Sequence, residues 1–127
     1  MRYGFDDEQA QMFMLLTGAA SLFAKDGDKF AGIVAMRPLE DAGAAEMKRL
    51  YVREDWRGQG LGRELVARII GCARAQGYVA LRLDTVPQLE AAIALYLDLG
   101  FKEIGDYSDG TSIYLGAELR YFELDLT

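Results

Sequence analysis

The chain has 127 residues, of which 51% are hydrophobic and 27% are charged, so its length and composition suit one domain with a single core. We therefore predict a single domain over residues 1–127. The net charge of −6 disfavours general binding to nucleic acid, because affinity for phosphate backbones depends on a surplus of Lys and Arg. The sequence contains no apolar signal core or membrane span, and its one cysteine, Cys72, cannot form an internal disulfide. We expect a cytoplasmic protein with no membrane partner, in which Cys72 serves packing.

Hydrophobic periodicity and turn signals divide the N-terminal half into one helix and three strands. The apolar spacing within residues 5–17 predicts a helix. Apolar runs predict strands over residues 21–24 and 29–36. A hairpin at Lys25-Asp26-Gly27-Asp28 joins them, because Asp-Gly readily adopts positive φ angles. A third strand is expected over residues 45–52.

The C-terminal half alternates helices with strands. Residues 61–76 predict a helix with one apolar face, and residues 79–84 alternate as a strand does. A second helix is expected over residues 88–99, followed by strands over residues 101–104 and 118–126. The first of these helices lies between two predicted strands, which makes a βαβ unit with parallel strand pairing. The predicted fold class is therefore α/β, with a mixed sheet.

A glycine-rich stretch opens the first of these helices, and it reads Arg57-Gly58-Gln59-Gly60-Leu61-Gly62-Arg63. Glycines let the backbone come close to a ligand, and several N–H groups can converge on an anion at the positive end of the helix. A dinucleotide-binding fingerprint would need glycine at Arg63, and a P-loop would need a Gly-Lys-Ser/Thr ending that is absent. The stretch therefore predicts a phosphate cradle of a different kind, with the spacing Arg-x-x-Gly-x-Gly.

Two further segments accompany the glycine stretch: Glu46-Met47-Lys48-Arg49-Leu50-Tyr51-Val52 before it and Leu95-Tyr96-Leu97-Asp98-Leu99-Gly100-Phe101 after it. Together the three strongly resemble the GNAT superfamily of acyl-CoA-dependent N-acyltransferases, from about residue 21 to the C-terminus. The resemblance implies a GNAT-like fold around a central βαβ acyl-CoA-binding unit. It also implies an N-acetyltransferase that moves an acetyl group from acetyl-CoA, its cosubstrate, to a primary amine by direct attack, without a metal. The alternative is a catalytically inactive protein that binds acyl-CoA or regulates another.

The N-terminus departs from the family pattern. Members of the family usually begin with an additional strand and helix ahead of the helix expected at residues 5–17, and this chain starts too late to contain them. The expected consequence is an uncovered sheet edge and an incomplete wall on the acceptor side. We predict that a partner subunit covers the edge or completes the wall, in a homodimer.

Acylation of an amine needs a general base, because a free alkylamine is mostly protonated near neutral pH. The chain has no histidine, so a carboxylate or a water chain led by one must do this work. Glu46 is the first candidate, since the resemblance implies a base-like glutamate at this strand position. Glu46 can equally pair with Lys48 or Arg49, or with a basic side chain on a neighbouring strand. Asp84, at the end of the next strand, is the reserve carboxylate.

The resemblance also implies a catalytic role for Tyr96. A tyrosine hydroxyl near the sulfur can donate a proton to the leaving thiolate as the thioester breaks. The competing interpretation is that Tyr96 is a core aromatic on the apolar face of its helix. At Leu89 the family often has an asparagine that contacts the pantetheine arm, so that contact is not expected here.

For the cosubstrate, the resemblance implies that backbone groups of Leu50 and Val52 pair with the pantetheine arm as an added strand would. The cradle would hold the pyrophosphate through Arg57, Gly58, Gln59, Gly60, Leu61 and Gly62. Arg63 would reach the outer phosphate, and Arg68 can either join it or remain a solvated helix residue. Trp56 is expected to pack beside the loop.

The acceptor is left open by the sequence, with small amines, amino acids and peptide amines as candidates. Its wall would come from the first helix, from residues 39–44 and 107–115, and from a second chain. Tyr107, Asp109 and Tyr114 are candidate lining residues. Asp109 is first of all part of a turn, since Ser108-Asp109-Gly110 has turn composition.

Overall fold

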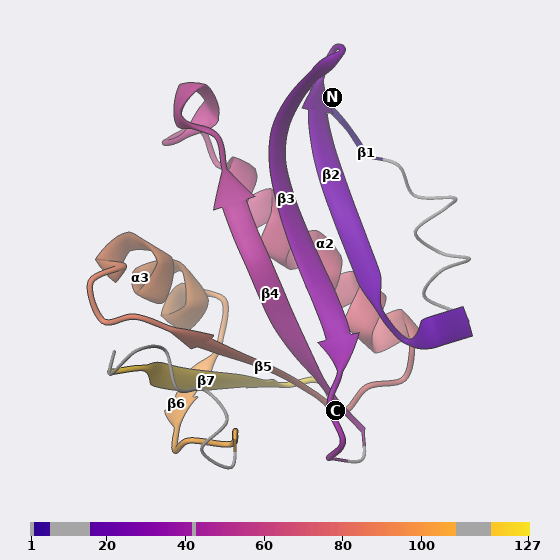
Figure 1. Ribbon diagram of the computed structural model, residues 1–127, viewed down its shortest axis with the longest axis vertical. Helices are drawn as coiled ribbons and strands as arrows, with labels where there is room; N and C mark the ends of the chain where they lie inside the picture. Colours follow the sequence, from indigo (N-terminus) through magenta and orange to yellow (C-terminus); the bar gives the residue numbers. More distant parts are fainter. Residues whose placement is uncertain (1, 6–15, 42, 109–117) are drawn as a thin grey trace.

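The computed structural model describes residues 2–5, 16–41, 43–108 and 118–127. It contains a seven-stranded mixed sheet with the strand order β1-β2-β3-β4-β5-β7-β6 (Figure 1). In chain order the elements are β1 Tyr3–Phe5, β2 Ala20–Asp26, β3 Lys29–Pro38, β4 Ala44–Val52, the 3₁₀ turn η1 Glu54–Trp56, α2 Leu61–Ala75, β5 Ala80–Thr85, α3 Glu90–Asp98, β6 Lys102–Ile104 and β7 Arg120–Asp125. This arrangement confirms the predicted α/β class.

The predicted hairpin is present, and its loop is Gly27–Asp28. Asp26 pairs with Lys29, and Gly27 has a φ of 63°, a left-handed value that glycine adopts without strain. The strands it joins run a few residues further than their apolar runs predict. Such differences at the ends arise because the backbone ladder continues past the buried side chains.

The expectation that no strand precedes the helix at residues 5–17 is wrong. Residues Tyr3–Phe5 form β1, which pairs antiparallel with the second half of β2 at Ala24–Asp26. Tyr3 is buried, so even this short strand contributes to the core. Phe5 therefore ends a strand, and most of the predicted helix, residues 6–15, lies outside the described residues. A three-residue strand carries too little pattern to be recognised from the sequence.

Helix α2 lies behind β2, β3 and β4 in Figure 1 and covers their inner face. Its buried side chains recur with helical spacing, as the sequence predicts: Leu61, Leu65, Val66, Ile69, Ile70 and Ala73. The helix approaches the sheet closely at Gly32, where a Cβ atom would lie 3.1 Å from Leu65 Cδ1 and 2.9 Å from the Tyr51 carbonyl oxygen. Glycine at this position therefore sets how near helix and sheet can come.

The parallel pairing of β4 with β5 is short, and this creates the main irregularity of the sheet. The two strands pair only at Ala44, Ala45 and Glu46, opposite residues 80–82. Beyond Glu46 the strands diverge, as Figure 1 shows, while β4 stays paired with β3 and β5 with β7. We call this divergence the fork.

A β-bulge lies on the β4 arm of the fork. The register between β3 and β4 shifts between Ile33 and Ala35, so β4 contains one residue more than β3 over this stretch. Arg49 falls there with a φ of 57°, the single left-handed non-glycine residue in the described chain. The bulge turns the strand just past the point where β5 leaves it.

Candidate active site

The glycine stretch forms a tight turn that ends at the first residue of α2. Gly58 and Gly60 have φ values of 74° and 86°, and a Cβ built on either one meets no atom within 4 Å. Both glycines therefore face open space rather than protein. The first N–H groups of a helix have no partner within it, and α2 is fifteen residues long. The turn thus presents free backbone donors and a helix dipole to an anion.

The polar side chains of the turn are held by the protein itself. Arg57 donates from Nε to the Val52 carbonyl oxygen at 2.8 Å, and Gln59 donates to the Asp55 carbonyl oxygen at 3.1 Å. Arg63 forms an ion pair with Asp98 of α3. Leu61 buries its side chain in the core, so only its backbone is available to a ligand. These contacts leave the backbone, more than the side chains, as the ligand-facing part of the turn.

The β4 arm of the fork leads directly into this turn. Leu50 and Val52, the two residues expected to pair with a pantetheine arm, lie beyond Glu46, where β4 has no ladder with β5. Their side chains pack against the core and their strand keeps β3 on its other side. A free strand edge can accept an extended ligand as an added strand.

Glu46 lies at the last paired position of the fork and is almost fully buried, with 4% of its side chain exposed. Its Oε1 accepts a hydrogen bond from Arg37 Nε of β3 at 3.0 Å, and it lies 2.9 Å from Arg37 Nη2 and 3.2 Å from Lys48 Nζ in ion pairs. Its Oε2 accepts a hydrogen bond from the Tyr107 hydroxyl. Both oxygens are therefore occupied.

These contacts decide the ionisation of Glu46 and Tyr107. Burial raises the pKa of Glu46, but hydrogen bonds from Tyr107, Lys48 and Arg37 outweigh it and hold the pKa below its ordinary value. Burial, together with the hydrogen bond to Glu46, raises the pKa of Tyr107 well above its ordinary value. Glu46 is a carboxylate at neutral pH, and Tyr107 keeps its proton to donate.

Asp84 stands on the other arm of the fork, two residues beyond the last β5 residue that pairs with β4. It is half-buried and makes no hydrogen bond or ion pair with any described residue. Burial raises its pKa most strongly. The charge of Lys48 lowers the pKa, the charges of Glu46 and Asp106 raise it and that of Arg37 lowers it again, so the net shift is upward. The two carboxylates of the fork thus have pKa values shifted in opposite directions.

Tyr96 lies on α3 with its ring in the core. Its ring centroid lies 5.7 Å from that of Phe101 and 6.4 Å from that of Phe122 on β7. Burial raises the pKa of Tyr96 to about 12. The hydroxyl makes no hydrogen bond with the described residues and is not among the buried polar atoms, so it reaches solvent at the edge of the core. The packing expected of a core aromatic and an available hydroxyl are therefore both present.

The remaining candidates have four different outcomes. Trp56 packs beside the loop, as expected, and its indole N–H donates to Asp26 at 2.9 Å. Arg68 lies over the Phe5 ring and pairs with Glu64, so it is engaged on the helix surface. Leu89 is exposed at the start of α3. Asp109 and Tyr114 lie outside the described residues.

Arg37 is the site residue that the sequence analysis did not identify by name. It comes from β3, nine residues before Glu46, and meets it because the two residues are direct cross-strand partners. The signal in the sequence was limited to the general expectation of a basic partner on a neighbouring strand. Which basic residue fills that place depends on the register of β3 against β4.

Within the described residues, no group of three or more Asp, Glu, Cys or His side chains is arranged to hold a metal ion. None of the helices described has the length and hydropathy of a membrane span.

A mixed sheet that opens beside a glycine turn and a helix N-terminus defines a class of protein that binds a phosphate-bearing ligand along a strand edge. Comparison with known families identifies which family of this class the chain belongs to. The model of the acetyltransferase (GNAT) family matches residues 2–101. The chain therefore belongs to the GNAT family of acetyltransferases, and the resemblance drawn from its three motifs is confirmed.

Individual relatives agree with this assignment. The chain is 45% identical over 76 residues to an uncharacterised N-acetyltransferase of Schizosaccharomyces pombe, a match that covers 60% of this chain and 47% of that protein. It is 34% identical over 99 residues to N-acetyltransferase 8F1 of Mus musculus, covering 75% of this chain and 45% of that protein. The chain thus spans less than half the length of these two relatives.

Among solved structures, a putative acetyltransferase of Salmonella typhimurium in complex with acetyl-CoA superposes with a TM-score of 0.75 at 25% sequence identity. The match covers 96% of this chain and 73% of that one.

Proposed function

We propose that this chain transfers an acetyl group from acetyl-CoA to the primary amine of a small molecule or peptide, by direct attack of the amine on the thioester. The observation that carries the proposal is the continuity of the fork with the glycine turn. The unpaired edge of β4 begins at Met47 and leads into a turn where Gly58 and Gly60 leave open backbone in front of α2. A thioester arm and a pyrophosphate need such neighbouring sites.

In this proposal the backbone of Leu50 and Val52 holds the pantetheine arm, and the turn from Arg57 to Gly62 holds the pyrophosphate. Arg63 reaches the outer phosphate after giving up Asp98. Both members of that pair are more than half exposed, at 52% and 64%, so the pair contributes little, about 0–1 kcal/mol, and a phosphate can replace it.

Bound acetyl-CoA supplies an activated acyl carbon whose thiolate can leave. The protonated amine first loses one proton to the base, which passes it to solvent. As the C–N bond forms and the C–S bond breaks, the nitrogen loses a second proton and the leaving thiolate gains one. Tyr96 is the proposed donor to the sulfur, since a pKa of about 12 keeps its hydroxyl protonated throughout the neutral range. Its ring is fixed by Phe101 and Phe122, which gives the hydroxyl a defined position.

Two carboxylates compete for the role of base. Glu46, the candidate from the sequence, already accepts hydrogen bonds from three side chains and has a lowered pKa, so it is a weak proton acceptor. Asp84 has no hydrogen-bond or ion-pair partner among the described residues and has a raised pKa, which makes it the better proton acceptor of the two. We assign proton removal to Asp84, directly or through a water, and positioning of the fork to Glu46.

A second candidate function is binding of acyl-CoA without turnover. The exposed Leu89 favours it, because an apolar residue stands at the family's pantetheine-contacting asparagine. The two functions are separated by measuring whether free CoA is released from acetyl-CoA when an amine is added.

The test measures CoA release by the purified chain with acetyl-CoA and a panel of primary amines, alongside calorimetric titration with acetyl-CoA. Amine-dependent release supports the transferase, and Tyr96→Phe should then lower kcat by about 10–100-fold with little change in affinity for acetyl-CoA. Binding of acetyl-CoA with no release against any amine favours the second function. A folded chain that does not bind acetyl-CoA contradicts both.

We also propose that the chain forms a homodimer through the free edge of β2. Strand β1 covers Ala24–Asp26, which leaves residues 20–23 of the β2 edge without a described strand partner. Light scattering after size-exclusion chromatography tests this, and a monomer at high micromolar concentration would contradict it.

A further inference from the structure

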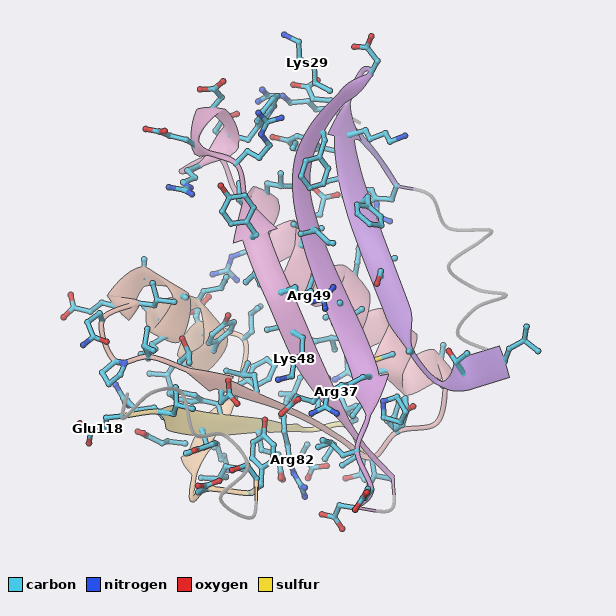
Figure 2. All side chains as sticks on the ribbon, viewed as in Figure 1. Lys29, Arg37, Lys48, Arg49, Arg82 and Glu118 are labelled. Carbon is cyan, nitrogen blue, oxygen red and sulfur yellow. The ribbon has the colours of Figure 1, made fainter. Side chains whose placement is uncertain are left out.

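The β3–β4 arm of the fork gathers cations. Arg37, Lys48 and Arg49 are labelled in Figure 2 near one another on this strand pair, whereas Lys29 lies at the far tip of the β2–β3 hairpin. The Arg37 side chain is 57% exposed and that of Lys48 is 33% exposed. Both therefore contact the buried Glu46 and also reach solvent. Arg49 is exposed at the bulge and has no ion pair with a described residue.

The positive charges of Arg37 and Lys48 are not fully neutralised by neighbouring carboxylates. Arg37 and Lys48 share one carboxylate oxygen, Glu46 Oε1, so this trio retains one positive charge. Lys48 keeps N–H donors beyond the one directed at Glu46, and Arg37 keeps its second amino group. Arg82 is different, because Asp41 and Glu123 each lie 2.8 Å from its guanidinium and neutralise it.

The opposite arm of the fork is acidic. Asp84 of β5 carries a carboxylate without a described partner, and the exposed Asp106 adds a second negative charge near it. The fork therefore has cations on its β3–β4 arm, and the carboxylates of Asp84 on β5 and of Asp106 after β6 lie opposite them, in a protein whose net charge is −6. A ligand that matches both arms carries an anionic and a cationic group of its own.

We propose that the acceptor is an amino acid, whose free carboxylate binds Arg37 and Lys48 while its amine faces Asp84. This rests on the proposed acetyl transfer and names the substrate class of the same site. Arg37 recognises a carboxylate through charge-assisted hydrogen bonds, and Lys48 adds a second cation. Polyamines and other purely cationic acceptors are disfavoured, because they offer no anionic group to Arg37 and Lys48.

The experiment compares acceptors that differ only in the carboxylate. The pairs are L-alanine with L-alaninamide, and β-alanine with β-alaninamide. The two pairs differ in the separation between carboxylate and amine, so the experiment samples two separations. The amides have less basic amines, so the intrinsic chemistry at neutral pH favours them. A preference for the acid therefore reports recognition of the carboxylate.

We expect the acid of at least one pair to exceed its amide in kcat/KM by about tenfold or more, the effect of one charge-assisted hydrogen bond. Arg37→Gln and Lys48→Gln should each reduce this acid-to-amide ratio towards one, even if they also lower overall activity through Glu46. Lys29→Gln removes a cation distant from the fork and should leave the ratio unchanged. Equal use of acid and amide by the wild type, or a ratio that survives both variants, overturns the inference while the transferase activity stands.

Failure of the proposed function itself gives a different result, namely no acetylation of any acceptor. The inference is then judged by calorimetric binding of N-acetyl-L-alanine and N-acetyl-L-alaninamide, and of the corresponding β-alanine products, in the presence of CoA. Tighter binding of an acid that is lost in Arg37→Gln supports carboxylate recognition. Equal binding of each acid and its amide overturns it.

Discussion

Glu46 and Asp84 carry the same chemical group on the two arms of the fork, and their surroundings separate their properties. Glu46 is buried against Arg37, Lys48 and Tyr107, which stabilise its charge. Asp84 is half-buried without such partners, so its charge is disfavoured. Environment alone thus shifts the pKa values of the two carboxylates in opposite directions, and the roles that we propose for them rest on this difference.

The first prediction for individual residues concerns the contribution of Glu46 to stability. Glu46→Gln should lower the free energy of unfolding at pH 7 by about 1–3 kcal/mol, because it removes a buried charge that three side chains contact. The folded pKa of Glu46 lies below its ordinary value of 4.5. Its contribution is therefore complete above about that pH and is lost as the pH falls through the folded value. Urea unfolding of wild type and variant between pH 7 and pH 3 should show the difference shrinking on acidification.

Glu103 provides the matched control for this measurement. It pairs with Arg120 through two hydrogen bonds of 2.8 and 2.7 Å, but both side chains are exposed. Glu103→Gln should therefore have a smaller effect, since solvent screens an exposed ion pair. Equal losses for the two variants would show that burial at the fork adds nothing.

The second prediction concerns activity. Asp84→Asn should lower kcat by about 10²–10³-fold with an amine acceptor, because it removes the proposed proton acceptor. The folded pKa of Asp84 is raised above 3.8, so its charge lowers the stability of the folded state at pH values above the folded pKa. Asp84→Asn should therefore leave stability at pH 7 unchanged or slightly higher, and thermal unfolding checks this alongside kinetics.

The pH dependence separates the two carboxylates. In the wild type, kcat/KM should fall on acidification through the raised pKa of Asp84, and Asp84→Asn should abolish this acidic limb. If Glu46→Gln removes the limb and Asp84→Asn keeps it, Glu46 is the base and our assignment is reversed.

At the scale of elements, the glycine turn and helix α2 act together. The turn positions backbone donors because Gly58 and Gly60 adopt left-handed conformations, and α2 adds its N-terminal charge. The helix is in turn held to the sheet by its buried face and by the close approach at Gly32. The packing of α2 against the sheet therefore fixes the position of the glycine turn.

A pair of glycine variants separates ligand contact from backbone strain. Gly60→Ala and Gly27→Ala both place a side chain at a left-handed residue, with φ values of 86° and 63° and open space around the new Cβ. Each should cost roughly 1–2 kcal/mol of stability. Only Gly60→Ala should weaken acetyl-CoA binding, by about tenfold or more, because its methyl group occupies the proposed phosphate approach. Calorimetric affinities that fall equally in both variants would place the cradle elsewhere.

At the scale of the whole molecule, one sheet joins both ends of the described chain. Strand β1 begins at Tyr3 and β7 ends at Asp125, and all seven strands belong to the same sheet. The core likewise extends from Tyr3 to Leu124 without a break into separate clusters. Removing either end therefore disturbs the same unit.

This continuity predicts a single cooperative unfolding transition for residues 1–127. Thermal curves followed by near-ultraviolet and far-ultraviolet circular dichroism should coincide, because no part of the sheet has an independent core. Two separated transitions would contradict the prediction of a single domain.

Much of this protein is determined by local sequence. The helices, the main strands and the hairpin are set by apolar spacing and turn residues, which act over a few positions of the chain. The glycine turn is equally local, since Gly58 and Gly60 adopt φ values that other residues rarely take. The family could be recognised for the same reason, because its three motifs are short and lie in order.

The tertiary structure alone decided which residues meet at the fork. The end of β4–β5 pairing after Glu46, the approach of Tyr107 and the pairing of Arg37 with Glu46 all depend on strand register between distant segments. Strand β1 was missed because three residues form it only through their pairing with β2. The opposite pKa shifts of Glu46 and Asp84 have the same origin, since they arise from burial and from neighbours that only the assembled sheet brings together.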